Sequence, residues 1–261
     1  MKVVVCLKQV PDTAEVKIDR ATNTLIREGV PSIINPFDRY ALEEAVRIKE
    51  RLGASVTVLS MGPDQVKEAL REALSLGADE AILLSDRAFA GADTLATSYS
   101  LARGIEKIGG YDLILFGKQA IDGDTGQVGP GVAEVLGLPH ITLVRRLVDL
   151  REGQVKVERL VEGGWELLAT ALPAVFTVVK EINEPRVPSI KGMLRAKRAE
   201  IPVWRAADLQ ADPRRTGLAG SPTRVAKIYT PVFDRQAEVL SGTAGEQAQA
   251  LVARLRENKI I

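Results

Sequence analysis

The sequence has little of the chemistry on which metal centres and covalent catalysis depend. Cys6 is the only cysteine and His140 the only histidine among 261 residues. A single cysteine excludes an internal disulfide framework and a cysteine-based zinc site, and it suits a reducing compartment. A single histidine argues against a histidine-rich metal site or a Ser-His-Asp arrangement. We therefore expect a cytoplasmic protein without a resident metal and without a catalytic constellation of its own.

Long apolar runs and an excess of charge of one sign are missing as well. No apolar stretch approaches the ~20 residues of a membrane span, and the run at residues 3–7 is too short for a signal sequence. The 35 Lys and Arg nearly balance the 34 Asp and Glu. Balanced charge gives no reason to expect nucleic acid or an anionic membrane as a partner. We expect neither nucleic-acid binding nor membrane insertion.

Short apolar segments alternate with amphipathic ones up to about residue 139. The apolar segments carry apolar residues on both faces, as central parallel strands do, and each amphipathic segment ends at a glycine. The expected strands are 3–7, 56–60, 81–84 and 113–116, and the expected helices are 38–52, 64–76 and 93–108. This order predicts an α/β fold with a doubly wound, mostly parallel sheet. Such sheets bind ligands at the carboxyl ends of their strands.

The second half of the chain predicts additions to that sheet. Strand patterns separated by glycine-containing turns indicate an antiparallel extension. They cover residues 141–150, 155–161 and 165–170, and a further strand is expected at 174–180. Residues 206–224 have the composition of an extended linker, and 246–258 that of a helix with one apolar stripe. We therefore expect a nucleotide-binding domain over residues 1–205 and a C-terminal arm over 206–261 that packs on a partner subunit.

A glycine-rich loop, residues 117–130, follows the strand that ends at Phe116 and leads into a helix. Glycine lets the backbone approach a ligand closely, and the N–H groups at a helix start favour phosphate. The loop matches neither the P-loop nor the dinucleotide fingerprint. Two interpretations stay open at this point, an unusual nucleotide site and a plain turn without a ligand.

A proline-containing, basic segment at residues 183–202 is the second feature of interest. Ser189 is placed to cap a short amphipathic helix, and the segment has no aromatic residue to stack on bases. A protein-docking element therefore explains it better than an RNA site does. The residues expected to take part in docking are Glu184, Pro185, Arg186, Ile190, Met193, Leu194, Arg195 and Lys197.

Four stretches, in the right order, resemble the β-subunit family of electron-transfer flavoproteins. They are residues 8–12, 35–38, 117–130 and 183–197, and the likeness covers nearly the whole chain. The resemblance implies a heterodimer with an α subunit, FAD held mainly by α, and an AMP buried in β. It also implies a carrier that accepts electrons from acyl-CoA and related dehydrogenases. The carrier would pass those electrons to a membrane quinone oxidoreductase.

The family's AMP positions transfer to this sequence residue by residue. They fall on Cys6, Asn35, Asp38, Met61, Asp122, Gly123, Asp124, Thr125, Gly126, Gln127 and Val128. Many members carry a threonine at the position of Val128, and valine cannot make that hydrogen bond, which leaves Thr125 or Gln127 as its substitute. Phe37 matches a position near the α-bound flavin, and Ile190 matches a leucine that plugs into the dehydrogenase.

Two alternatives to a structural AMP remain. The loop at residues 122–130 is more similar to family members that bifurcate electrons, and those carry a second FAD whose ADP part occupies the AMP site. A stand-alone sensor protein that binds an adenine nucleotide is the other alternative. The sensor predicts a colourless monomer, whereas a carrier predicts a yellow protein that purifies with a second chain.

Overall fold

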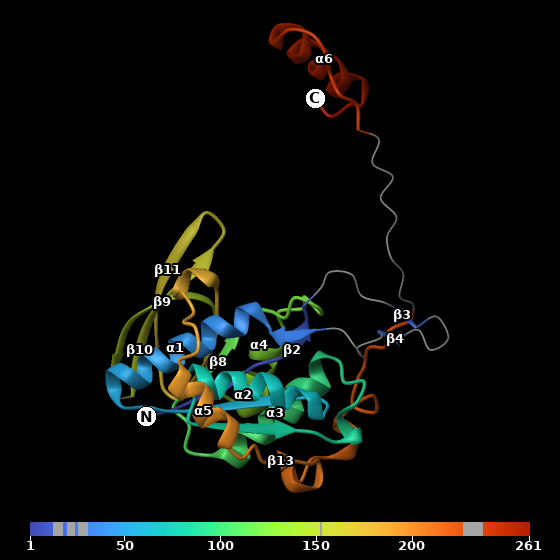
Figure 1. The fold of residues 1–261 in the computed structure, drawn as a ribbon. Helices are drawn as coiled ribbons and strands as arrows, with labels where there is room; N and C mark the ends of the chain where they lie inside the picture. Colours follow the sequence, from blue (N-terminus) through green and yellow to red (C-terminus); the bar gives the residue numbers. More distant parts are fainter. Residues whose placement is uncertain (13–17, 20–23, 26–30, 152, 227–236) are drawn as a thin grey trace. The chain divides into compact units, whose positions relative to one another are not determined.

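The computed structural model describes residues 1–12, 18–19, 24–25, 31–151, 153–226 and 237–261. It divides into two compact units, Met1–Ala226 and Lys227–Ile261. The first unit is an α/β domain built on a nine-stranded sheet with the order β11-β10-β9-β12-β8-β1-β6-β7-β13 (Figure 1). In the second unit, helix α6 (Ala244–Glu257) begins with a capping box between Thr243 and Glu246.

The large sheet has a parallel part and an antiparallel part, as predicted. The parallel strands are β1 (Lys2–Cys6), β6 (Ser55–Met61), β7 (Glu80–Leu84), β8 (Leu113–Gly117), β12 (Ala174–Val178) and β13 (Val203–Trp204). β9 (His140–Arg151) runs parallel to β12, and it forms an antiparallel meander with β10 (Gln154–Val161) and β11 (Gly164–Ala171). Two small antiparallel pairs, β2 (Gln9–Pro11) with β5 (Ser32–Ile34) and β3 (Ile18–Asp19) with β4 (Thr24–Leu25), complete the described strands.

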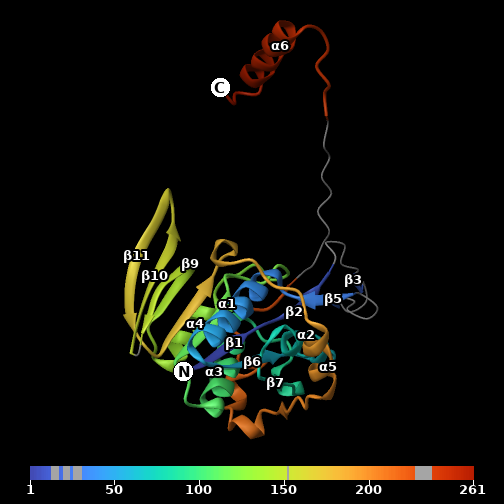
Figure 2. The same cartoon turned by 60° about the vertical axis from the view of Figure 1, so that its left-hand side comes forward.

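Helices cover both faces of the sheet (Figure 2). The apolar side chains of α1 (Pro36–Leu52) and α2 (Lys67–Leu76) pack in one core, and those of α3 (Thr94–Ile108) and α4 (Val128–Leu136) pack in another. Strand β1 serves both cores because its side chains alternate: Val3 and Val5 lie in the first, Val4 and Cys6 in the second. A strand buried on both faces reads as a continuous apolar run, which is why β1 was predictable.

Strand β1 also marks the point where the order in which the chain adds strands to the sheet reverses. It lies between β6 and β8, and the chain proceeds from β1 outward to β6 and β7 before it returns to β8 and β12 on the other side. In open α/β sheets, ligands bind outside the carboxyl ends of the strands at such a switch point. The ends of β1 and β8 therefore define where a ligand is to be sought.

The predicted helices and strands differ from the observed ones mainly at their ends. The expected helix at 64–76 opens with a short 3-10 turn, Asp64–Val66, before α2 begins at Lys67. The expected strand at 174–180 ends at Val178, and a second 3-10 turn, Lys180–Ile182, follows it. Ser189 caps helix α5 (Ile190–Arg198) by accepting a hydrogen bond from the backbone N–H of Gly192, as predicted.

Residues 206–226 pack on the α/β domain, in contrast to the extended linker expected from their composition. Leu209 is buried against the core around α3, and its carbonyl oxygen accepts two hydrogen bonds from the guanidinium of Arg103. The backbone N–H of Asp212 donates to the hydroxyl of Tyr99 at 2.9 Å. The segment folds as two 3-10 turns, Ala207–Leu209 and Pro213–Arg215, without the periodicity of a helix or strand. The compact unit therefore extends to Ala226, beyond the boundary expected at residue 205.

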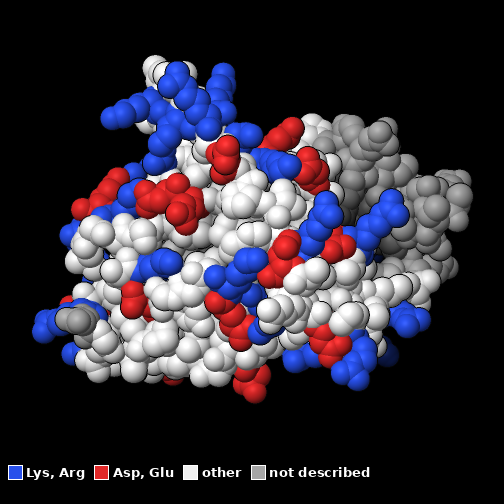
Figure 3. Space-filling model, turned by 90° about the horizontal axis from the view of Figure 1, so that it is seen from below, with Lys and Arg blue, Asp and Glu red and all other residues white. Residues whose placement is uncertain are grey.

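The surface of the described residues gives two further findings. No helix among them is long and apolar enough to cross a membrane. On the face drawn in Figure 3, basic and acidic side chains are interspersed, with one group of Lys and Arg together at the upper left. This face therefore carries no broad surface of a single charge.

Candidate functional site

The candidate site begins with Asp38, which lies in the first turn of α1. One oxygen of its buried carboxylate accepts a hydrogen bond from the backbone N–H of Lys8 at 2.7 Å, and the other accepts from that of Gly117 at 3.1 Å. A Cβ atom at Gly117 would lie 2.5 Å from the carbonyl carbon of Phe37, so the close approach requires glycine. The start of α1 is thus held against the ends of β1 and β8.

Asn35 fixes the chain on either side of the same point. Its fully buried carboxamide donates to the carbonyl of Gln119 at 2.8 Å and accepts from the N–H of Ile121 at 3.1 Å. Its backbone N–H donates to the carbonyl of Lys8 at 2.8 Å. Asn35 and Asp38 together therefore shape the first half of the glycine-rich loop. The requirement to satisfy buried polar groups explains why both side chains are polar here.

Burial controls the electrostatics behind the loop. Desolvation raises the pKa of Asp38 to about 7, although the hydrogen bonds from Lys8 and Gly117 act in the opposite direction. Burial, with a smaller effect of the nearby Asp38 charge, raises the pKa of the Cys6 thiol well above its ordinary value. Cys6 is therefore held as a neutral thiol, which is a poor nucleophile.

The second half of the loop faces solvent. Lys8 Nζ forms an ion pair with Asp122 at 2.7 Å, and the carboxamide of Gln119 donates to Asp124. Asp124 and Gly126 have φ angles of +53° and +63°, in the left-handed region. A loop in this conformation, with small residues at its turn, can bring its backbone N–H groups to a ligand.

The loop ends at the start of α4, which lies very close to its neighbours. A Cβ atom at Gly129 would be 2.6 Å from Cγ2 of Thr177, and one at Gly131 would collide with the hydroxyl of Ser98. The N-cap residue, Gln127, makes no side-chain capping hydrogen bond, and its side-chain oxygen accepts from the hydroxyl of Thr94 at 3.2 Å. The first N–H groups of α4 therefore lack a side-chain cap, and the helix dipole favours an anion there.

A cleft opens beside the loop, outside the ends of β1 and β6. The space in and over it is about 500 Å³, a volume that includes open solvent, and the cleft is lined by Lys8, Gln9, Val10, Pro11, Ser32, Met61, Gly62, Pro63, Gln65, Val66 and Asp122. Gln9 Oε1 is buried without a hydrogen-bond partner. The cleft therefore combines apolar walls, one unused acceptor and the Lys8–Asp122 ion pair.

The structure brings the expected nucleotide residues to one edge of the sheet but at different depths. Cys6 and Asp38 are buried behind the loop, Met61 lines the cleft, and the exposed part of the loop lies in front. Phe37 is half-buried, with the ammonium of Lys118 4.8 Å from its ring centroid. Lys8, Gln9 and Thr94 also lie here, although they were not among the expected nucleotide residues. For Lys8 and Gln9 the sequence held a signal, because they come shortly after β1 at a strand end where ligands are expected.

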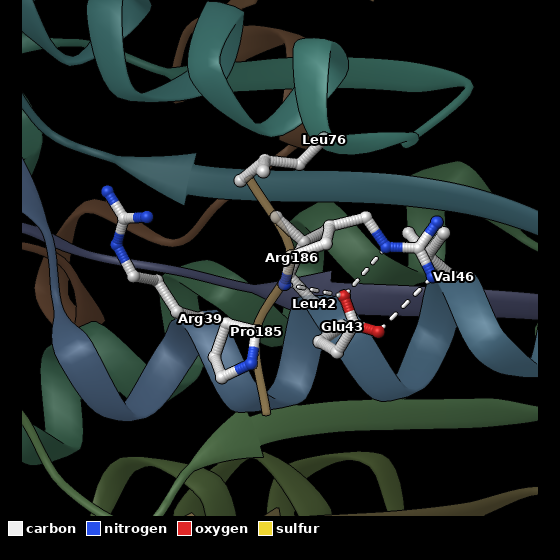
Figure 4. A pocket seen from close by; sticks show the side chains of 7 residues that line it. All are labelled: Arg39, Leu42, Glu43, Val46, Leu76, Pro185 and Arg186. Carbon is white, nitrogen blue, oxygen red and sulfur yellow. Dashed lines mark hydrogen bonds and ion pairs between the residues drawn. The ribbon is translucent and has the colours of Figure 1, made fainter. Parts of the chain in front are cut away.

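Four of the expected docking residues have exposed side chains that bind no other described residue by a hydrogen bond or ion pair, and the other four make contacts within the chain. Ile190 is 75% exposed, and Met193, Leu194 and Lys197 are exposed too. The remaining four make contacts within the chain: Arg186 pairs with Glu43 and Glu50, Pro185 lies in the pocket drawn in Figure 4, Arg195 donates to two backbone carbonyls although it is exposed, and the backbone carbonyl of exposed Glu184 accepts from Arg47. The basic charge of this segment is therefore only partly available to a partner.

Comparison with known proteins identifies the family. The family model described as electron transfer flavoprotein domain matches residues 22–209. The chain is 52% identical over 262 residues to electron transfer flavoprotein subunit beta of Thermoanaerobacterium thermosaccharolyticum, with 100% of both chains covered. It is 49% identical to the caffeyl-CoA reductase-Etf complex subunit CarD of Acetobacterium woodii, again over 100% of both chains. It is 46% identical to protein FixA of Azorhizobium caulinodans, over 98% of this chain and 94% of that protein. The chain therefore belongs to the β-subunit family of electron transfer flavoproteins.

Proposed function

We propose that this chain is the β subunit of a heterodimeric electron-transfer flavoprotein and that it binds AMP at the switch point. The partner is an α subunit that holds most of the FAD. The heterodimer takes electrons from acyl-CoA and related dehydrogenases and passes them to a membrane quinone oxidoreductase. The observation that carries the proposal is a glycine-rich loop tied to the ends of β1 and β8 by Asn35 and Asp38, which ends at an uncapped helix start.

The residues present fit an adenine nucleotide. The uncapped start of α4 and the left-handed Gly126 provide backbone N–H groups for the phosphate. Lys8, which is ion-paired with exposed Asp122, supplies a cation beside the loop. The apolar wall around Met61 and Val66 suits a flat heterocyclic ring. In this assignment Cys6 and Asp38 lie in the protein interior beneath the loop and do not contact the ligand.

Gln127 takes the place of the hydroxyl that Val128 lacks, and Thr94 orients its side chain. The hydroxyl of Thr94 lies at the start of α3 and is hydrogen-bonded to the side chain of Gln127 at 3.2 Å. Of the two substitutes considered from sequence, Thr125 and Gln127, this contact favours Gln127. Its carboxamide is oriented by Thr94, and oriented side chains bind with less loss of entropy.

The role of the chain is binding and orientation, without chemistry on the nucleotide. When bound, FAD supplies the electron-carrying chemistry, and the protein supplies position and electrostatics. The two carboxylates of the loop are engaged, Asp122 with Lys8 and Asp124 with Gln119. Neither forms an acid–base pair with the other. We therefore assign an electron carrier subunit, and no enzyme, to this chain.

A second FAD in place of AMP is the second candidate, and the loop at residues 122–130 favours it, because that loop is more similar to family members that bifurcate electrons. The cleft continues from Asp122 past Met61 to Val66, and buried Gln9 Oε1 provides an acceptor without a donor. AMP and the ADP part of FAD both place an adenine ring against the apolar wall of this cleft, and the adenine amino group can donate to that acceptor. One of the relatives is itself named as a subunit of a caffeyl-CoA reductase-Etf complex.

Release of the bound ligands distinguishes the candidates. The chain is co-expressed with its α subunit, the heterodimer is denatured, and the released nucleotides are separated and quantified. One FAD and one AMP per heterodimer support the structural AMP, and two FAD without AMP support the second candidate. A chain that purifies as a colourless monomer in the presence of α overturns the carrier and favours the sensor.

A further inference from the structure

Helix α5 contacts α2 through a glycine. The two helices lie side by side in both ribbon views (Figures 1 and 2), and their residues are in contact. A Cβ atom at Gly192 would collide with the backbone carbonyl of Ser75. Only glycine permits this approach, so the separation of α5 and α2 is set by their backbones and not by adaptable side chains.

Two arginines cap the two helices reciprocally. The guanidinium of Arg195 on α5 donates to the carbonyls of Leu74 and Ala78 at the end of α2, at 2.8 and 2.6 Å. The guanidinium of Arg71 on α2 donates to the carbonyls of Ala196 and Ala199 at the end of α5, at 2.9 and 3.2 Å. The last carbonyls of a helix lack partners within it and carry its negative dipole end. Each helix end is therefore satisfied by the other helix.

A third arginine fixes the segment that leads into α5. Arg186 pairs with Glu43 at 2.8 Å and with Glu50, and its backbone N–H also donates to Glu43 (Figure 4). The side chain of Glu43 is only 4% exposed. Although burial raises its pKa, the hydrogen bonds from Arg186 and Arg47 hold the pKa of Glu43 below the usual range. Glu43 is therefore ionised at neutral pH, and the contact is a charge-assisted one.

This arrangement leaves the apolar side chains of α5 unpartnered and turned to solvent. Ile190, Met193 and Leu194 are all exposed, although they belong to a helix that is fixed at both ends. Lys191 and Lys197 are exposed on the same helix. An apolar group with cations around it matches an apolar pocket with an acidic rim.

We propose that Arg195 is a positioning residue, which holds α5, the expected docking segment for the electron-donating dehydrogenase, on α2. The proposal rests on the proposed function, because it assigns to the same docking segment the origin of its rigidity. It also changes the role of Arg195. From sequence alone this residue reads as part of a basic patch that steers the encounter.

The two roles of Arg195 predict different kinetics. A steering charge changes the rate of encounter, and its effect fades as salt screens it. A positioning residue changes the cost of ordering α5 in the complex, and that cost does not depend on salt. Loss of Arg195 should therefore raise the dehydrogenase concentration needed for half-maximal electron transfer, without changing the rate in the assembled complex.

The test is stopped-flow reduction of the αβ flavin by an acyl-CoA dehydrogenase reduced with its acyl-CoA, over a range of dehydrogenase concentrations at two ionic strengths. Arg195→Ala should raise the half-saturating concentration roughly tenfold at both ionic strengths, with the saturating rate unchanged. Lys197→Ala, the matched control on the same helix, should have a smaller effect that disappears at the higher ionic strength. Hydrogen exchange of the α5 amides should accelerate in Arg195→Ala and not in Lys197→Ala.

Arg195→Lys separates charge from geometry, and it serves as the test should Arg195→Ala fail to assemble. Lysine keeps the charge, but its ammonium ends one bond short of Nη2, the Arg195 nitrogen that donates to both carbonyls. A steering role predicts wild-type kinetics, whereas the positioning role predicts a salt-independent increase smaller than that of Arg195→Ala. The proposal is overturned if Arg195→Ala behaves like Lys197→Ala, or if Arg195→Lys equals the wild type. A variant Ile190→Ala with wild-type kinetics would instead contradict the docking function itself.

Discussion

The carboxylate of Asp38 and the backbone N–H of Gly117 are joined by a buried hydrogen bond of 3.1 Å, while the same carboxylate accepts from Lys8 at 2.7 Å. Gly117 ends β8, and Lys8 lies shortly after β1. The side chain of Asp38 therefore connects the ends of the two strands at the switch point of the sheet. The glycine-rich loop starts at this connection. Its conformation is therefore determined by α1, which precedes it by some eighty residues.

Loss of the Asp38 carboxylate should weaken both the fold and nucleotide binding. Asp38→Ala leaves the N–H groups of Lys8 and Gly117 buried without acceptors, so we expect a loss of about 3 kcal/mol of unfolding free energy. Urea unfolding of the variant measures this loss. The exposed ion pair of Asp122 provides the control, since Asp122→Ala should cost less than about 1 kcal/mol. Equal stability of Asp38→Ala and wild type would contradict the assigned role.

The stability conferred by Asp38 should depend on pH. Its pKa is raised from 3.8 to about 7 in the folded state, so between these values the folded protein binds more protons than the unfolded chain does. Stability therefore falls as pH rises through this window. The difference in unfolding free energy between wild type and Asp38→Ala should be larger at pH 5 than at pH 8. A difference that is the same at both pH values would show that Asp38 titrates normally, and a difference that is larger at pH 8 would likewise contradict the raised pKa.

Ile190 should matter for docking and not for assembly. Its side chain is 75% exposed and belongs to neither the nucleotide site nor the core. A buried aliphatic anchor contributes about 2 kcal/mol at an interface, so Ile190→Ala should slow electron transfer from subsaturating dehydrogenase some tens-fold. Flavin content and size-exclusion behaviour serve as controls and should stay unchanged. Transfer at the wild-type rate would exclude the segment as the docking element.

The C-terminal unit should be required for the heterodimer. Leu251 and Val252 are exposed on α6, which gives this helix an apolar surface for a partner. A chain that stops after Ala226 keeps the packed segment 206–226, so it should fold and yet fail to retain the α subunit. Size exclusion of the co-expressed proteins measures this. If the truncated chain still elutes with α, the arm does not hold the subunits together.

The sequence predicted the elements whose neighbours are close along the chain or whose burial is uniform. β1 and β8 are apolar on both faces, and Ser189 precedes its helix directly. Prediction from the sequence failed where the packing partner is distant along the chain and the residues have no helix or strand periodicity. Residues 206–226 are held on α3 by hydrogen bonds to their backbone, such as the one from the Arg103 guanidinium to the carbonyl of Leu209. Contacts of this kind impose no periodic pattern on the sequence.

Arginine roles show the same limit. Arg195 and Arg186 look like members of one basic patch in the sequence, whereas in the structure they bind α2 and α1 respectively. In the sequence, a charged residue on an amphipathic helix gives the same pattern whether its side chain contacts solvent or the end of a helix more than a hundred residues away. Contacts of this kind are visible only once the fold has brought the helices together.

The loop that ends at α4 is proposed to bind an adenine nucleotide, and a substitution at Gly126 is the sharpest test of that binding. Gly126 has a φ of +63°, so Gly126→Val places a β-branched side chain in a conformation that it rarely adopts, at the expected phosphate position. Gly123→Ala is the control, because a Cβ there meets no atom closer than Lys8 Nζ at 3.9 Å. We predict that the purified αβ heterodimer of Gly126→Val has lost the β-bound adenine nucleotide, while wild type and Gly123→Ala release it in stoichiometric amount on denaturation. Stoichiometric nucleotide in Gly126→Val would place the site elsewhere and contradict the account.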